Sequence, residues 1–265
     1  MTYEEMRDRL VGLLQQIDAH VGTHTPSAQV DTTRDQGLTL ALFANCRSLL
    51  RGITFLLKED HGQEATILMR TLLQDATTIF YVFKNQPTTS EVTLEFEAAS
   101  LRQERLILEE AMKHAPDEQT EAALKEVDSH LQQTVADAEE LDIELKPLPP
   151  VEQLFAKVGL SEGYYFFRYA SHAVHTSRLA LWSRMTEYPD GRVTINFGGT
   201  PEAVLTVGLF SGELLLSAYR ATARLLKWDT LDDVEAFAVN HQDAFLEFRR
   251  DAGVTTKGFG HPDTS

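Results

Sequence analysis

Apolar side chains recur at helical spacing along most of this chain. Between residues 2 and 21 they return every three or four positions, which predicts a helix with one buried face. The stretch 37–58 is apolar nearly all round, so we expect this helix at the centre of the fold, and 201–227 predicts another mostly apolar helix. Similar patterns predict the remaining helices at 63–84, 88–114, 117–142, 151–158, 163–182 and 229–250.

The breaks between these stretches carry residues that end or begin helices. Residues 22–36 begin with Gly22 and are interpreted as a polar connection, and prolines make 145–150 an extended connector. Thr200 and Pro201 suit the cap and the first turn of the helix that follows them. After a Pro-Asp-Gly turn, alternating apolar and polar residues predict at most one short β-hairpin near 186–197.

These patterns predict an all-α fold, a multi-helix bundle of about eight helices. No internal repeat and no second hydrophobic centre divides the sequence, so residues 1–265 are expected to form a single domain. Residues 86–145 should project from the bundle as an acidic helical hairpin, because apolar positions are sparse in both of its helices. The glycine-rich segment 253–265 is expected to be a disordered tail.

The net charge of −16 is concentrated in the predicted hairpin. Residues 86–145 hold 16 Asp and Glu against four Lys and Arg, so they account for −12 of the total. A broad surface for DNA is therefore not expected, whereas a local basic pocket elsewhere is compatible with the charge. The single cysteine, Cys46, and a charged N-terminus without a secretory signal indicate a cytoplasmic protein. No uninterrupted apolar run reaches the ~18 residues of a membrane span, so no membrane contact is expected.

The predicted helix at 163–182 carries a narrow polar face on an otherwise apolar surface. At about 100° per residue, His175 lies within ~20° of Arg168 and His172 within ~40°, and Ser171 lies beside them. A guanidinium and two imidazoles are unfavourable to bury without partners. They therefore either line a site or are satisfied by neighbours inside the bundle.

The predicted helix at 63–84 has a matching thin polar line, which consists of Gln63, Thr66, Arg70, Gln74 and Thr77. A face exposed to solvent would be rich in Lys and Glu, whereas this line is uncharged except for Arg70. That composition is typical of a line buried against another polar surface. We expect the two polar lines to meet, with Arg70, Gln74, Ser171 and His172 as ligand-binding candidates.

The two polar lines could support metal-independent cleavage of a phosphodiester bond. A histidine with a near-neutral pKa can transfer a proton to or from RNA, and an arginine beside it can hold the phosphate. Arg168 and His175 are the catalytic candidates, because two helical turns bring both to one phosphate. An arginine followed after four to six residues by a histidine, on a late helix of a helical bundle, resembles the motif of the HEPN superfamily. The resemblance implies a dimeric ribonuclease of a toxin or antiviral system, although Tyr169 stands where that superfamily favours a polar residue.

A second resemblance covers roughly residues 37–185. The helix around Arg70 and the later Ser171 and His175 are similar to a widespread bacterial family of unknown function. That family shows Arg-x-x-x-Glu on one helix, then an acidic stretch, then Ser-x-x-x-His. Gln74 stands where the family usually has glutamate, so an arginine–carboxylate pair would become an arginine–amide contact here.

Three alternatives remain open beside cleavage of RNA. His172 and His175 could bind a metal ion together with Asp75, Glu64 or His61, but Arg70 would repel a cation, so no metal and no cofactor is expected. The arginines with Tyr81, Tyr164, Tyr165 and Tyr169 could instead form a binding module for a small anionic ligand or a protein partner. The polar lines could also be a buried structural network. In each case a homodimer is the expected assembly.

Overall fold

The computed structural model describes residues 1–25, 33–85, 89–174, 185–187, 190, 192–195 and 200–253. Almost all of the described residues are helical, as expected for an all-α fold. The helices are α1 (Tyr3–His24), α2 (Arg34–Lys58), α3 (Gly62–Lys84), α4 (Thr89–His114), α5 (Glu118–Glu140), α6 (Val151–Lys157), α7 (Ser161–Val174), α9 (Pro201–Leu225) and α10 (Leu231–Ala252). Two short strands, β1 (Met185–Glu187) and β2 (Val193–Ile195), pair antiparallel in the predicted hairpin region.

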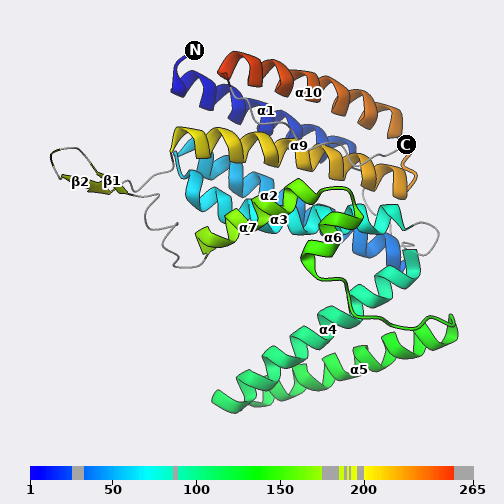
Figure 1. Ribbon diagram of the computed structural model, residues 1–265. Helices are drawn as coiled ribbons and strands as arrows, with labels where there is room; N and C mark the ends of the chain where they lie inside the picture. The colour runs from blue at the N-terminus through cyan, green and yellow to red at the C-terminus, as the bar shows by residue number, and fades with distance from the viewer. Residues whose placement is uncertain are drawn as a thin grey trace.

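Helix α9 is the central element of the bundle. It packs against α1 and α10 on one side and against α2 and α3 on the other (Figure 1). Helix α7 lies on the outer side of α3, with the short helix α6 beside it. Helix α2, which the sequence predicts to be central, is less buried than expected: 33% of its most apolar window is buried, against 72% in α9.

One contiguous cluster of buried side chains joins these helices. Its largest fully buried members include Tyr219 and Phe210 of α9, Phe245 and Phe248 of α10, and Phe155 of α6. No buried residue of α5 belongs to this cluster. The division into one domain stays a prediction, but the described core is continuous from α1 to α10.

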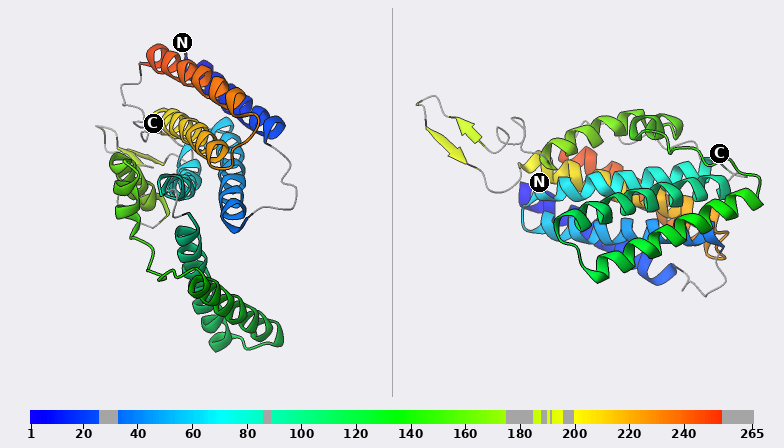
Figure 2. Two further views of the ribbon diagram at one scale, coloured as in Figure 1. Left: turned by 90° about the vertical axis from the view of Figure 1, so that its right-hand side faces the viewer. Right: turned by 90° about the horizontal axis from the view of Figure 1, so that it is seen from below.

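The acidic hairpin of the sequence prediction is the pair α4–α5, which extends away from the bundle (Figure 2). The two helices bury only a thin line of side chains between them, which includes Val127, Thr134 and Ala138 of α5. Arg34 of α2 connects the hairpin to the bundle through ion pairs with Glu97 (3.0 Å) and Asp137 (2.6 Å).

Two helix boundaries differ from the sequence prediction. Helix α1 does not end at Gly22 but continues to His24. Gly22 lies inside the helix, where a Cβ atom would meet the guanidinium at the flexible end of the Arg47 side chain, so this glycine does not end the helix. Helix α2 begins at Arg34, three residues early, because Thr33 and Gln36 form a reciprocal capping box.

Other boundaries agree closely with the sequence. The hydroxyl of Thr200 accepts a hydrogen bond from the backbone N–H of Ala203, and Pro201 begins α9, as predicted. Helix α10 ends at Gly253, whose φ of 66° is the left-handed conformation that glycine favours. The predicted disordered tail, apart from Gly253, and the second half of the helix predicted at 163–182 lie outside the described residues.

Within the described part of the chain, two helices are long and apolar enough to cross a membrane by length and composition alone, the segment Gln36–Lys58 of α2 and the whole of α9. The most apolar window of α9 is 72% buried, as in the core helix of a soluble protein, and that of α2 is 33% buried. Both helices pack against α1 and α3 within the bundle. A cytoplasmic location stays a prediction.

Candidate functional site

Helix α7 is held on the bundle by its apolar face. Phe167 and Ala170 are buried against the core, and α7 packs on both α3 and α6. The opposite positions, Arg168 and His172, are exposed. The local sequence therefore fixes which way the predicted polar face points.

The polar lines of α3 and α7 meet at one point. The Nε–H of Arg70 donates a hydrogen bond of 2.9 Å to the hydroxyl of Ser171. The Ser171 hydroxyl in turn donates to the backbone carbonyl of Phe167 at 2.7 Å. The Arg70 guanidinium lies 4.5 Å from the centre of the Phe167 ring, which adds a cation–π contact. The contact expected between α3 and α7 is therefore present, and it joins the side chains of Arg70, Ser171 and Phe167.

A pocket of about 400 Å³ opens beside this contact. We call it the arginine pocket, and it is lined by Pro150, Val151, Glu152, Tyr164, Phe167, Arg168, Ser171 and His172. Its volume lies within the range of about 300–1,000 Å³ that is usual for small-molecule sites. Arg70 stands behind its wall, because both of its partners, Phe167 and Ser171, line the pocket.

Neither arginine of the site has a carboxylate partner among the described residues. Arg168 is exposed and makes no ion pair there, and Arg70 contacts only a hydroxyl and an aromatic ring. This is unusual in a chain with 40 Asp and Glu against 24 Lys and Arg. Glu152 of α6 is the one carboxylate that lines the arginine pocket. Arg168 and Glu152 offset each other within the lining, so Arg70 behind the wall gives the surroundings of the pocket their positive excess, which favours an anion.

The comparisons with known proteins place this region in a family. A family model described as a family of unknown function (DUF5677) matches residues 36–192. The chain belongs to this family. Neither the curated proteins nor the solved structures contain a match to the chain.

The DUF5677 match confirms the resemblance that the sequence shows over roughly residues 37–185, because it covers α2 to α7 and includes Arg70 and Ser171. The DUF5677 family has no known function. Membership therefore supports residues 36–192 as the region that holds the candidate site, and it indicates no activity. The resemblance to HEPN ribonucleases stays a prediction.

Two of the candidate residues stand apart from the contact. Gln74 is exposed on α3 and does not line the arginine pocket, and the described partners of Arg70 are Ser171 and Phe167. His175 lies outside the described residues. Its catalytic role and the ligand role of Gln74 stay predictions.

The rest of the polar line of α3 is arranged differently from the prediction. Thr66 and Thr77 are buried, but their hydroxyls donate to carbonyls of their own helix, those of Gly62 and Leu73. Thr66 also lines a pocket with Tyr165 and Tyr169 of α7, so it lies toward that helix. Among Thr66, Arg70 and Thr77, Arg70 is the residue whose side-chain hydrogen bond crosses to α7.

The described residues contain no group of three His, Cys, Asp or Glu side chains that could hold a metal ion. The Asp75 carboxylate accepts a hydrogen bond of 2.6 Å from the Asn45 side chain, and burial raises the pKa of Asp75. His61 lies 3.8 Å from Glu64, at the start of α3. Asp75, His61 and Glu64, the candidate metal ligands, therefore contact one another or a residue of α2.

Sequence reasoning missed part of the pocket wall. Pro150, Val151 and Glu152 line the arginine pocket, although they belong to the connector and the start of α6. No pattern in the sequence shows where that connector runs. Of the tyrosines named for a binding module, Tyr164 lines this pocket, Tyr165 and Tyr169 line a second one, and Tyr81 is buried beneath Lys157.

Proposed function

We propose that the arginine pocket binds a small anionic ligand that carries a phosphate group. The observation that supports it most is Arg168, an exposed guanidinium that lines the pocket and has no ion-pair partner among the described residues. A guanidinium binds phosphate through two parallel hydrogen bonds, which makes it the preferred side chain for such ligands. His172 lies one helical turn away in the same pocket and adds a second donor.

Arg70 supports this function from behind the wall. Its hydrogen bond holds Ser171, and its guanidinium adds positive potential close to the pocket. The Ser171 hydroxyl already donates to the Phe167 carbonyl, so it would present its oxygen and not its proton to a ligand. We therefore expect Arg168 and His172 to contact the ligand and Arg70 to position the wall.

The test is a calorimetric titration at low salt with adenosine monophosphate and, in parallel, with adenosine. The monophosphate should bind and adenosine should not, because the phosphate supplies the interaction. Arg168→Ala should weaken binding by about tenfold or more, which corresponds to one charge-assisted pair. The matched control is Arg102→Ala, an exposed arginine on α4 that also lacks an ion pair with a described residue and lies outside the pocket.

Equal binding of adenosine and its monophosphate would contradict the proposal. So would an equal loss of affinity in Arg168→Ala and Arg102→Ala, since that result would indicate a non-specific electrostatic effect.

A second candidate function is cleavage of RNA without a metal ion. The observation that favours it is the presence of Arg168 and His172 in one pocket, a phosphate-binding group beside a group that can transfer a proton. A mixed RNA pool should then be cut in the presence of a chelator. His175→Ala should abolish the cleavage and His172→Ala should reduce it, without unfolding the protein. If the wild-type protein leaves RNA intact while it binds the monophosphate, the chain is a binding module.

We further propose that two copies of the chain associate. Helix α2 supports this idea, because it is apolar along most of its length while its most apolar window is only 33% buried in one copy. Phe55 of α2 is 65% exposed. Light scattering should give the mass of a dimer, and Phe55→Ser should lower it to that of a monomer. A monomeric wild-type protein would contradict this part of the proposal.

A further inference from the structure

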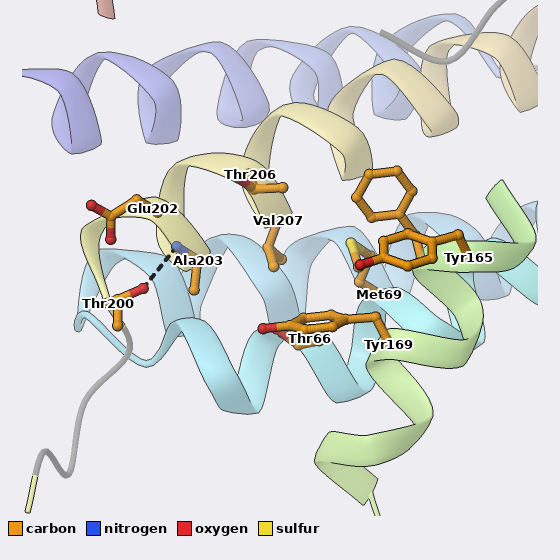
Figure 3. A pocket seen from close by; sticks show the side chains of 10 residues that line it. Thr66, Met69, Tyr165, Tyr169, Thr200, Glu202, Ala203, Thr206 and Val207 are labelled. Carbon is orange, nitrogen blue, oxygen red and sulfur yellow. Dashed lines mark hydrogen bonds between the residues drawn. The ribbon is translucent and has the colours of Figure 1, made fainter. Parts of the chain in front are cut away.

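Helix α7 has a second pocket on its other side. We call it the tyrosine pocket, and Figure 3 shows it between α7, α3 and the first turns of α9. Its volume is about 270 Å³. It shares no lining residue with the arginine pocket, so the two are separate sites on opposite faces of one helix.

Aromatic side chains from α7 form one end of the tyrosine pocket. Tyr165 is 69% exposed and Tyr169 is 45% exposed, although both rings lie at the wall of a concave site. Met69 of α3 and Val207 of α9 are almost fully buried and make the floor apolar. Exposed aromatic rings beside an apolar floor suit a flat apolar or aromatic group, which can stack on the tyrosines.

The other end of the tyrosine pocket carries a negative charge. Glu202 lies across the pocket from the two tyrosines, in the first turn of α9 (Figure 3). It is exposed and makes no ion pair with any residue in the described part of the chain. The carboxylate lies close to the positive end of the α9 helix dipole.

No basic residue offsets this charge within the pocket. The ten described lining residues include no Lys, Arg or His, and Glu202 is their one acidic member. The tyrosine pocket therefore has the opposite charge preference to the arginine pocket. An anion is disfavoured here, and a cation that reaches Glu202 is favoured.

We propose that the tyrosine pocket binds a small organic amine in its ammonium form, with an aromatic body. The aromatic ring lies against Tyr165 and Tyr169, and the ammonium group donates to the Glu202 carboxylate. The small volume limits the body to about one aromatic ring with a short alkyl chain. This site is independent of the anion proposed for the arginine pocket, because the two share no residue.

The experiment uses phenethylamine as the probe, with 2-phenylethanol and phenylacetate as its neutral and anionic counterparts. The full-length protein is labelled with ¹³C at the methionine methyl groups. The chain has five methionines, and Met69 lines the tyrosine pocket. Phenethylamine should shift the Met69 signal through the ring current of the probe and leave the signal of Met112, on the distant hairpin, unchanged.

Binding should follow the order amine, then alcohol, then carboxylate. Glu202→Gln should weaken phenethylamine binding by about fivefold or more and leave the alcohol unaffected. The matched control is Glu162→Gln, because Glu162 is also an exposed acidic residue in the first turn of a helix and lines neither pocket. Tyr169→Leu should weaken binding of both the amine and the alcohol, since each stacks its ring on the tyrosine.

Two results would overturn the proposal. One is that phenethylamine leaves the Met69 signal in place at all concentrations tested. The other is that Glu202→Gln and Glu162→Gln change the affinity equally, which would show that only the net charge of the protein matters. Titration with adenosine monophosphate should not shift the Met69 signal, so failure of this proposal can be told apart from failure of the arginine pocket.

Discussion

Two arginines each join a pair of helices in this protein, and their surroundings differ. Arg249 of α10 is 7% exposed and holds both carboxylate oxygens of Glu213 on α9, each at 2.8 Å. Arg70 of α3 is only half-buried, and it meets a hydroxyl and an aromatic ring of α7. Arg249 is thus an example of a structural arginine in this fold, one whose charge is paired with a carboxylate inside the bundle. Arg70 lacks such a carboxylate and lies beside a pocket, which is the arrangement expected at a site for an external anion.

The largest effect is expected at Arg249. Arg249→Met should lower the free energy of unfolding by about 3–5 kcal/mol, because it removes the ion pair of the Glu213 carboxylate in a mostly buried position. Urea unfolding measures this change. The double variant Arg249→Met with Glu213→Leu should recover most of the stability, since no unpaired charge remains. A loss below about 1 kcal/mol in the single variant would mean that the ion pair is not structural.

A smaller effect is expected at Arg70. Arg70→Met should lower the free energy of unfolding by about 1–2 kcal/mol, because it removes one hydrogen bond and one cation–π contact without leaving a carboxylate unpaired. Ser171 keeps its hydrogen bond to the Phe167 carbonyl in this variant. Urea unfolding beside the Arg249 variants gives the comparison. A loss as large as that of Arg249→Met would make Arg70 part of a structural network.

The smallest effect on stability is expected at Gln74. Gln74→Glu places a carboxylate one turn after Arg70 on α3 and restores the Arg-x-x-x-Glu pattern of the family. Such a pair adds about 0.2–0.5 kcal/mol of stability on a helix surface. It should also weaken binding of adenosine monophosphate, because the new carboxylate partly neutralises Arg70. Unchanged affinity in a calorimetric titration would show that Arg70 does not influence the pocket.

The sequence predicts the helices well because their signals are local. Apolar spacing locates α1 to α7, α9 and α10, and the charge excess of 86–145 identifies the exposed hairpin. The boundary at Gly22 was predicted wrongly because the same residue can end a helix or make room for a side chain such as Arg47. That choice depends on packing between helices, which a single sequence does not show.

Part of the candidate site is also predictable from local signals in the sequence. Matching thin polar lines predict the contact between Arg70 and Ser171, which the structure contains. They do not show that Thr66 and Thr77 donate their hydroxyls within α3, because a threonine can satisfy its hydroxyl within its own helix even where it lies toward α7, as Thr66 does. The pocket itself depends on the path of the connector that brings Glu152 to α7, and no local pattern records that path.

The most direct test of the account is urea unfolding of the wild-type protein, Arg70→Met and Arg249→Met, each with and without adenosine monophosphate. A ligand that binds only the folded state stabilises it by an amount set by its affinity. We predict that the monophosphate stabilises Arg249→Met as much as the wild-type protein and stabilises Arg70→Met much less. Equal stabilisation of all three proteins, or none in the wild type, would contradict the claim that Arg70 belongs to an anion site.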